Sequence, residues 1–194
     1  MAGCRPFTDD EVADILSSFG GTFATRDRSL FLLGVKSGFR ISELLSLRIG
    51  DVMRNGSIVS SVTVARRNMK KKTAGRTVLL QPEVKAALFA WISELDPKGS
   101  RMRDTFLFHS RKGGNRPISR QQYRRILGEI YDSLEITGNT GTHSMRKTYA
   151  RRAYEITGKD LFQTQKLLGH VNINSTVSYL SSTDEEISRL MLMI

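Results

Sequence analysis

Residues 166–181 read KLLGHVNINSTVSYLS, and this stretch places a histidine and a tyrosine at the two ends of a short turn and helix. An apolar helix is expected to end at Leu168, with Gly169 in the turn, because glycine readily adopts the left-handed conformation that ends many helices. His170 follows at once and Tyr179 comes nine residues later. Taken alone, such a histidine is usually a hydrogen-bonded structural residue, and such a tyrosine usually packs at a core boundary. The meaning of the pair depends on the rest of the chain.

The chain of 194 residues carries a strong positive charge. Thirty Lys and Arg against nineteen Asp and Glu give a formal net charge of +11. This balance favours a polyanionic partner, above all nucleic acid, and the alternative is a soluble protein that is simply basic. The single cysteine, Cys4, excludes an internal disulfide and a cysteine-based zinc cluster. No apolar run is long enough to cross a membrane, and the first residues have no signal-peptide core. A cytoplasmic protein without a membrane partner is therefore expected.

Hydrophobic periodicity predicts a mainly helical chain. The first helix opens at Thr8, which forms a capping box with Glu11, and stops at Gly20. A second helix ends at Gly38. Further helices are expected over 41–48, 82–95, 120–134 after a cap at Ser119, 143–157 after a cap at Thr142, 159–168, 174–181 and 184–194. The inner face of the helix over 82–95 is expected to consist of Val84, Leu88, Trp91 and Ile92.

Between residues 51 and 80 the pattern changes to β-branched residues around Asn55-Gly56, a pair typical of two-residue hairpin turns. A basic, polar turn follows, and another strand ends at Leu80. The sequence predicts a mixed fold, mainly α-helical with a small three-stranded antiparallel β-sheet. Because no linker or repeat interrupts the chain, residues 1–194 are expected to form one domain.

Two pairs of residues suggest an anion site. His143 and Arg146 lie three residues apart in the first turn of an expected helix, where backbone N–H groups favour an anion. The alternative is a surface histidine beside a solvated arginine. Arg40 follows a glycine at the start of a helix and precedes Glu43 by three residues. Its guanidinium forms either a structural ion pair, or a contact with a ligand, or both.

Two basic segments are candidates for contact with nucleic acid. One is the turn that carries Lys70, Lys71 and Lys72, and the other is the helix that begins RQQYRRILGEI at residue 120. The helix offers side chains suited to phosphates or to guanine edges. They are Arg120, Gln121, Arg124 and Arg125. A solvated basic turn and a solvated basic face are the alternatives.

Taken in order, these segments resemble the tyrosine recombinases, also called phage integrases. Residues 37–52 (SGFRISELLSLRIGDV) resemble the first arginine box of that family, and residues 72–80 (KTAGRTVLL) its lysine hairpin. Residues 142–150 (THSMRKTYA) resemble its His-x-x-Arg box, and residues 167–180 (LLGHVNINSTVSYL) its His-to-Tyr box. One such box is weak evidence, whereas four in order, between about Arg5 and Ser182, are specific.

The resemblance implies the catalytic-domain fold of these DNA breaking-rejoining enzymes, and a role for each residue. Arg40 and Arg146 would bind the non-bridging oxygens of the scissile phosphate and stabilise the pentavalent transition state. His143 and His170 would complete this cage, with His143 as the general base toward Tyr179. Tyr179 would attack phosphorus and form a 3′-phosphotyrosine with release of a 5′-hydroxyl.

Two further roles are implied by the same resemblance. Lys72 would protonate the leaving 5′-oxygen, and it is preferred over Lys70 and Lys71 because the KT pair before the VLL strand best fits the family pattern. Glu43 would orient the region around Arg40. No metal, ATP or other cofactor is implied, since two arginines and two imidazoles surround the phosphate and its bond energy is kept in the protein–DNA link.

The implied function is site-specific DNA recombination, in integration, excision or inversion, by a homo-oligomer of two to four chains on double-stranded DNA. The alternatives are a type IB topoisomerase-like activity and an inactive DNA-binding accessory or regulatory protein. Typical members also carry an N-terminal domain that grips DNA, for which there is no room before Thr8. A single catalytic domain is therefore expected, either excised or a naturally short member. Its apolar tail, residues 184–194, would pack on its own domain or dock on a neighbouring protomer.

Overall fold

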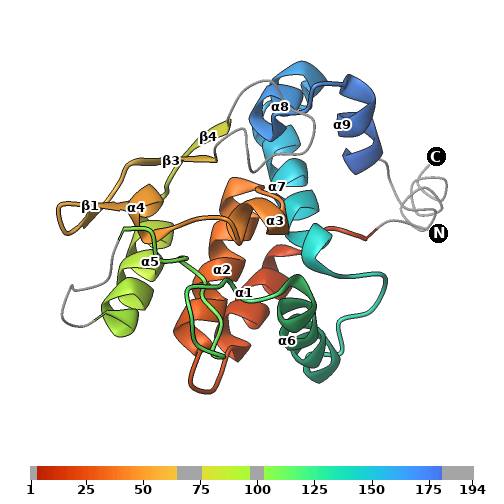
Figure 1. Ribbon diagram of the computed structural model, residues 1–194. Helices are drawn as coiled ribbons and strands as arrows, with labels where there is room; N and C mark the ends of the chain where they lie inside the picture. Colours follow the sequence, from red (N-terminus) through yellow and green to blue (C-terminus); the bar gives the residue numbers. More distant parts are fainter. Residues whose placement is uncertain (1–3, 65–75, 97–102, 181–194) are drawn as a thin grey trace, which may run out of the picture.

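The computed structural model describes residues 4–64, 76–96 and 103–180, and these are mainly helical (Figure 1). The helices are α1 (Asp9–Ser18), α2 (Ala24–Ser37), α3 (Ile41–Leu44), α4 (Ile49–Val52), α5 (Pro82–Leu95), α6 (Arg120–Ser133), α7 (Thr142–Ile156), α8 (Leu161–Leu168) and α9 (Ile173–Leu180). The strands are β1 (Met53–Arg54), β2 (Ser57–Ile58), β3 (Ser61–Val64) and β4 (Arg76–Leu79). The predicted fold class, mainly helical with short antiparallel strands, is confirmed.

Helix α2 forms the centre of the core. It lies between α5 and α7, and it packs against both (Figure 1). Leu30, Phe31, Leu33 and Val35 on α2 have no exposed surface, so this helix is buried on nearly every side. Burial of each such side chain contributes roughly 1.5–3 kcal/mol. Because α2 is enclosed, the position of its C-terminal end is fixed by the whole domain.

Helix α5 confirms its predicted inner face. Its buried residues are Val84, Leu88, Trp91 and Ile92, and they face the core beside α2. The indole N–H of Trp91 donates a hydrogen bond of 2.8 Å to the carbonyl of Leu107. This bond satisfies the polar atom of the largest core side chain and ties the helix to the connection that leads to α6.

The prediction of one three-stranded sheet is wrong, because the strands pair differently. β1 and β2 form a hairpin around Asn55-Gly56, whose positive φ angles of 50° and 74° suit the predicted turn. β3 pairs antiparallel with β4, so the described strands form two separate two-stranded sheets. After β2 the backbone N–H of Val59 donates to the carbonyl of Val52 at the end of α4. The chain is thereby turned from the first pair before the second pair begins.

The capping predictions are confirmed at two helices and corrected at a third. Thr8 and Glu11 form the reciprocal capping box of α1, and the hydroxyl of Ser119 caps α6. Thr142 is the first residue of α7 and not its cap, because the preceding Gly141 occupies the cap position. The helix expected over 41–48 is also shorter than predicted, since α3 ends at Leu44 and a turn follows.

The last three helices form a compact layer. α8 and α9 pack on each other and on α7, and this group lies beside the C-terminal end of α2 (Figure 1). Within the ranges that the structure describes, no helix has both the length and the apolar character needed to span a membrane.

Candidate active site

The turn that ends α2 forms one wall of the site. Gly38 adopts a φ of 61°, in the left-handed region, and its N–H donates to the carbonyl of Gly34. The predicted end of this helix at Gly38 is therefore confirmed, with the conformation that favours glycine. Two residues later the chain begins α3, with Arg40 at the cap position. The turn thus delivers Arg40 immediately beside the terminal carbonyls of α2.

Arg40 is held by a buried carboxylate but keeps an exposed edge. Its Nη1 lies 3.0 Å from Glu43 Oε1, and its backbone N–H donates to Glu43 Oε2 at 2.7 Å. The side chain of Glu43 is 2% exposed and that of Arg40 is 35% exposed. A buried carboxylate is stable only with such partners. The structure therefore contains the predicted ion pair and also leaves part of the guanidinium accessible to a ligand.

Arg146 connects the ends of two helices. It is almost fully buried, its Nη1 donates to the carbonyl of Gly38, and its Nη2 donates to the carbonyl of Leu168 at 2.9 Å. Leu168 ends α8, where Gly169 adopts a φ of 60° and caps the helix as predicted. The C-terminal ends of helices carry partial negative charge, which suits a cation. Two helix ends therefore position one guanidinium.

The electrostatics around Arg146 favour an incoming anion. Burial and, to a smaller extent, the charges of Arg40 and Arg76 together lower the pKa of Arg146 to about 10, while Tyr179 and Glu43 act in the opposite direction. The group is still cationic at neutral pH. Its Nε is buried and has no hydrogen-bond partner among the described residues. An anion would supply the missing partner and would relieve the repulsion between the guanidinium groups.

His143 lies in the first turn of α7 and has one side open to solvent. Partial burial lowers its pKa below the ordinary value of 6.5, and the charges of Arg146, Arg40, Arg120 and Lys147 lower it further. The neutral imidazole is therefore favoured near neutral pH. A neutral imidazole beside a group of cations is suited to accept a proton.

His170 and Tyr179 lie side by side, as the family resemblance implied. Their ring centroids lie 5.2 Å apart with an angle of 62° between the planes. His170 is buried, and its Nδ1 lies 3.0 Å from the hydroxyl of the buried Thr176 on α9. The guanidinium carbon of Arg146 is 5.6 Å from the centroid of the Tyr179 ring. The tyrosine thus lies beside the most buried cation of the site.

The predicted site residues divide into those that the structure places and those that it does not. Arg40, His143, Arg146, His170 and Tyr179 form one cluster, linked by the contacts and mutual charge effects given above. Glu43 belongs to it through Arg40. Lys70, Lys71, Lys72 and the tail 184–194 lie outside the described residues.

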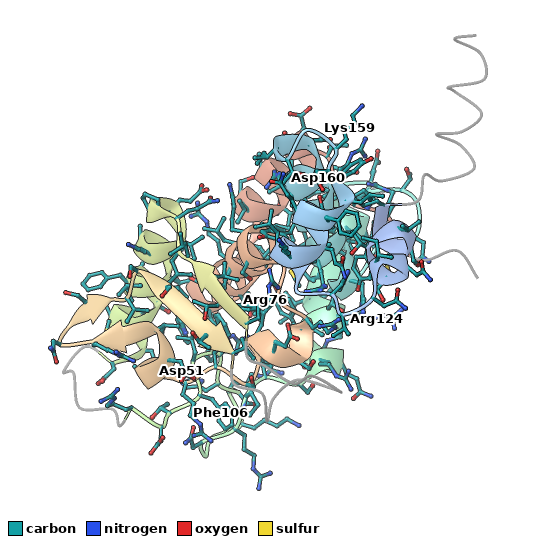
Figure 2. The ribbon with its side chains drawn as sticks, turned by 90° about the horizontal axis from the view of Figure 1, so that it is seen from above. Asp51, Arg76, Phe106, Arg124, Lys159 and Asp160 are labelled. Atoms are coloured by element: carbon teal, nitrogen blue, oxygen red, sulfur yellow. The ribbon has the colours of Figure 1, made fainter. Side chains whose placement is uncertain are left out.

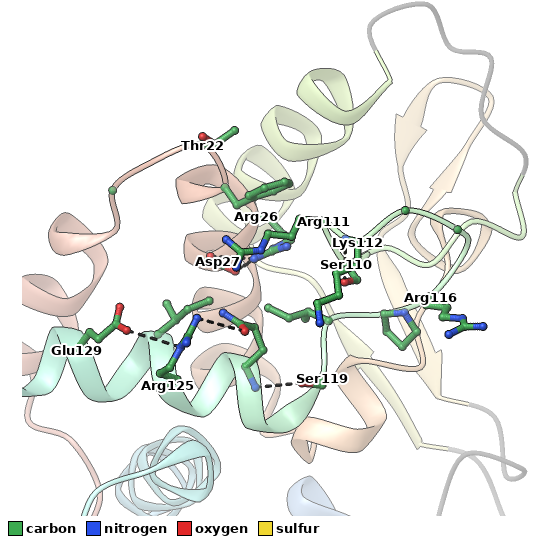
Figure 3. Close-up of a pocket in the computed structure, with 18 residues that line it drawn as sticks. Thr22, Arg26, Asp27, Ser110, Arg111, Lys112, Arg116, Ser119, Arg125 and Glu129 are labelled. Carbon is green, nitrogen blue, oxygen red and sulfur yellow. Dashed lines mark hydrogen bonds and ion pairs between the residues drawn. The ribbon is translucent and has the colours of Figure 1, made fainter.

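The predicted DNA-binding face of α6 is exposed but divided. Arg120, Gln121, Arg124 and Arg125 are all exposed. Arg120 lies near enough to the cluster for its charge to lower the pKa of His143. Arg125 instead lines a pocket between α2, α6 and residues 110–118 (Figure 3). None of the residues in the cluster around Arg146 lines this pocket. The exposed side chains of α6 therefore belong to two basic regions, one beside the cluster and one at the pocket.

Arg76, the first residue of β4, was not recognised as a site residue. It is buried, its Nη1 lies 3.1 Å from the carbonyl oxygen of Gly38, and its Nη2 lies 2.6 Å from that of Ser37. In Figure 2 the label of Arg76 lies between the yellow strands and the blue helices near the C-terminal end of the chain. The available signal was alternation, because Arg76, Val78 and Leu80 share the inward face of a strand whose Leu79 is 77% exposed.

Among the described residues, no three His, Cys, Asp or Glu side chains are grouped so that they could hold a metal ion. The polar part of the cluster consists of guanidinium groups, imidazoles, one phenol and one buried carboxylate. Such a set is suited to bind and polarise an oxyanion such as a phosphodiester, and it includes a candidate nucleophile and a candidate base.

Comparisons with known proteins agree with this chemistry. The model of the phage integrase family matches residues 5–186. The chain is 30% identical over 164 residues to the probable integrase/recombinase YoeC of Bacillus subtilis, covering 84% of this chain and 81% of that protein. It is also 30% identical over 189 residues to the tyrosine recombinase XerD of Mycobacterium leprae, covering 90% of this chain and 56% of that protein.

Solved structures show the same fold. The site-specific recombinase XerH, bound to its difH substrate before cleavage, matches with a TM-score of 0.71 and 21% sequence identity. The match covers 96% of this chain and 53% of that one. The chain therefore spans most of YoeC but only about half the length of XerD and XerH.

Proposed function

Because this chain belongs to the phage integrase family, we propose that it contains the catalytic centre of a tyrosine recombinase, which cuts and rejoins DNA at specific sites. The observation that carries the proposal is the position of Arg146. It is a buried cation fixed by the ends of α2 and α8, 5.6 Å from the ring centroid of Tyr179. This places a phosphate-binding group next to a candidate nucleophile.

The scissile phosphate would be bound by the two arginines of the cluster. The exposed edge of Arg40 and the unpartnered Nε of Arg146 would donate hydrogen bonds to the non-bridging oxygens. These oxygens gain negative charge as phosphorus becomes five-coordinate. Cations already fixed in a partly buried site stabilise that charge without further reorganisation, which lowers the barrier.

Cleavage would exchange one P–O bond for another and move two protons, one from Tyr179 and one to the leaving oxygen. The Oη of Tyr179 attacks phosphorus while neutral His143 accepts its proton, and the bond from phosphorus to the 5′-oxygen breaks. Lys72 donates a proton to the leaving 5′-oxygen in this scheme. The products are a 3′-phosphotyrosine and a 5′-hydroxyl. Attack by the 5′-hydroxyl of another strand reverses these steps, so rejoining needs no ATP.

Double-stranded DNA is the proposed partner. The net charge of +11 and the exposed basic residues of α6 support this assignment. XerH is a relative in fold whose solved structure contains its DNA substrate. Exchange of strands between two sites requires more than one active centre, so a homo-oligomer on paired sites belongs to the proposal.

The test is covalent capture of DNA. Nicked duplexes with a randomised site are incubated with the protein without divalent metal, and adducts that survive denaturation are isolated and sequenced. We expect an adduct with the wild type and with Tyr154→Phe, which changes a tyrosine on α7 outside the cluster, but none with Tyr179→Phe. If the wild type binds duplexes and yields no adduct, the chain is a non-catalytic DNA-binding protein and the proposal is wrong. If the protein forms the adduct and relaxes supercoiled plasmid but never joins two sites, its activity is topoisomerase-like.

A further inference from the structure

Arg76 is completely occupied by contacts within the domain. Its two terminal nitrogens donate to the carbonyls of Ser37 and Gly38, and its guanidinium carbon lies 5.1 Å from the Phe39 ring centroid and 5.5 Å from that of Tyr149. The residue is 8% exposed. Both terminal nitrogens of Arg76 are therefore used within the domain, whereas Arg146 keeps an Nε without a hydrogen-bond partner among the described residues.

The oxygen that Arg76 binds is shared with a residue of the site. The carbonyl of Gly38 accepts hydrogen bonds from both Arg76 and Arg146. Two cations at one acceptor repel each other, and the charge of Arg76 contributes to the lowered pKa of Arg146. The terminal carbonyls of α2 offset this repulsion through their partial negative charge. Without Arg76, the carbonyl of Gly38 that orients Arg146 would lose one of the two groups that hold it in place.

The same turn also determines the position of Arg40. Ser37 and Gly38, whose carbonyls Arg76 binds, precede Arg40 by three and two residues, and Arg40 opens α3. A shift of this turn would move Arg40 and the acceptor of Arg146 together. Arg76 thus supports, from a strand, the segment on which both phosphate-binding groups depend.

We propose that Arg76 is a positioning residue for DNA cleavage, which acts by holding the Ser37–Gly38 carbonyls so that Arg40 and Arg146 face the non-bridging oxygens of the scissile phosphate. This inference rests on the function proposed above. Arg76 would affect the chemical step more than the affinity for DNA, because it makes no contact with the duplex.

The first test compares Arg76→Met and Arg76→Lys with Arg54→Met, a matched change at an exposed arginine of β1. Single-turnover cleavage is measured at saturating protein, on a nicked duplex recovered from the covalent capture. We expect Arg76→Met to cleave about 100-fold more slowly, comparable to loss of one preorganised donor. Arg76→Lys should be intermediate, because an ammonium keeps the charge but not the fork. Arg54→Met should equal the wild type, and the DNA dissociation constants of all variants should agree within about threefold.

The second test distinguishes positioning from general damage to the fold. A methylphosphonate at the scissile position replaces one non-bridging oxygen, and with it the negative charge, by a methyl group, so the arginines matter less there. The defect of Arg76→Met should shrink to about tenfold or less on this substrate. A 5′-bridging phosphorothiolate, whose leaving group needs no proton, should leave the defect unchanged. If Arg76→Met does not fold, Arg76→Lys decides the comparison.

Three results would overturn the inference. The first is equal cleavage by the wild type and the Arg76 variants. The second is a defect of the same size on phosphate and methylphosphonate, which would indicate a purely structural role. The third is rescue by the phosphorothiolate, which would indicate action through the leaving-group acid. Failure of the wild type itself to form an adduct refutes the proposed function and is a separate outcome.

Discussion

Gly38 and Tyr149 are in direct contact, so that the ring of Tyr149 occupies the place where a side chain at Gly38 would lie. Gly38 also has a φ of 61°. An alanine at Gly38 would meet both the strain of the left-handed conformation and an overlap with the ring. We expect Gly38→Ala to lower the free energy of unfolding by about 2–4 kcal/mol, measured by urea denaturation.

The matched control is Gly113→Ala. Gly113 has a φ of 76°, but a Cβ atom there would meet no atom within 4 Å. Its replacement should therefore cost only the backbone term, about 1–2 kcal/mol. Equal losses in the two variants would show that Tyr149 moves aside without cost.

Because both terminal nitrogens of Arg146 donate to carbonyls, replacing it by lysine should slow cleavage strongly even though the positive charge is kept. In Arg146→Lys, one ammonium group replaces a planar fork that bridges the carbonyls of Gly38 and Leu168. We expect single-turnover cleavage to fall by about 100-fold or more and the free energy of unfolding by about 1–3 kcal/mol. Arg151→Lys, on the exposed side of α7, should change the free energy of unfolding by less than about 0.5 kcal/mol. Wild-type cleavage by Arg146→Lys would contradict the assigned role.

The lowered pKa of His143 predicts the pH dependence of cleavage. A general base works when deprotonated, so the rate should be level near neutral pH and should fall as the pH drops through the lowered pKa. The acid limb of a single-turnover profile should therefore give an apparent pKa below 6.5. His143→Gln should lose this limb and cleave about 100-fold more slowly. An apparent pKa above 6.5, or a limb that persists in His143→Gln, would assign the base to another group.

The contact between Thr176 and His170 predicts a smaller effect. Thr176→Val keeps the shape of the buried side chain but removes the hydroxyl that lies 3.0 Å from His170 Nδ1. Loss of one such hydrogen bond corresponds to about 0.5–1.5 kcal/mol, and hence to cleavage about 3–10-fold slower. DNA affinity should be unchanged. Ser175→Ala, at an exposed neighbour on α9, is the control and should match the wild type; an equal loss in both would point to a general disturbance of α9.

The sequence predicted the features that depend on local patterns. Gly38 and Gly169 were recognised as helix ends because a left-handed cap follows from the residue type. The inner face of α5 followed from its 3.6-residue period, and the hairpin at Asn55-Gly56 from its turn chemistry. The approach of His170 to Tyr179 was implied by the resemblance to the recombinase family and not by a local pattern.

Features that depend on distant partners were missed or predicted wrongly. Arg76 binds carbonyls 38 and 39 residues away, and no local pattern indicates such a partner. The split into two strand pairs depends on Val59, which donates to α4 and not to a strand. Local propensity indicated β structure between residues 51 and 80, but tertiary contacts decided the number of strands and their pairing.

The two glycine-capped helices that meet at Arg146 have a consequence for protein synthesis. Arg146 binds carbonyls 108 residues before it and 22 residues after it. A nascent chain on the ribosome therefore has no complete phosphate-binding site until residue 168 has left the exit tunnel, and no nucleophile until Tyr179 follows. Under the proposed function, a translation product that ends before these residues would therefore lack nicking activity.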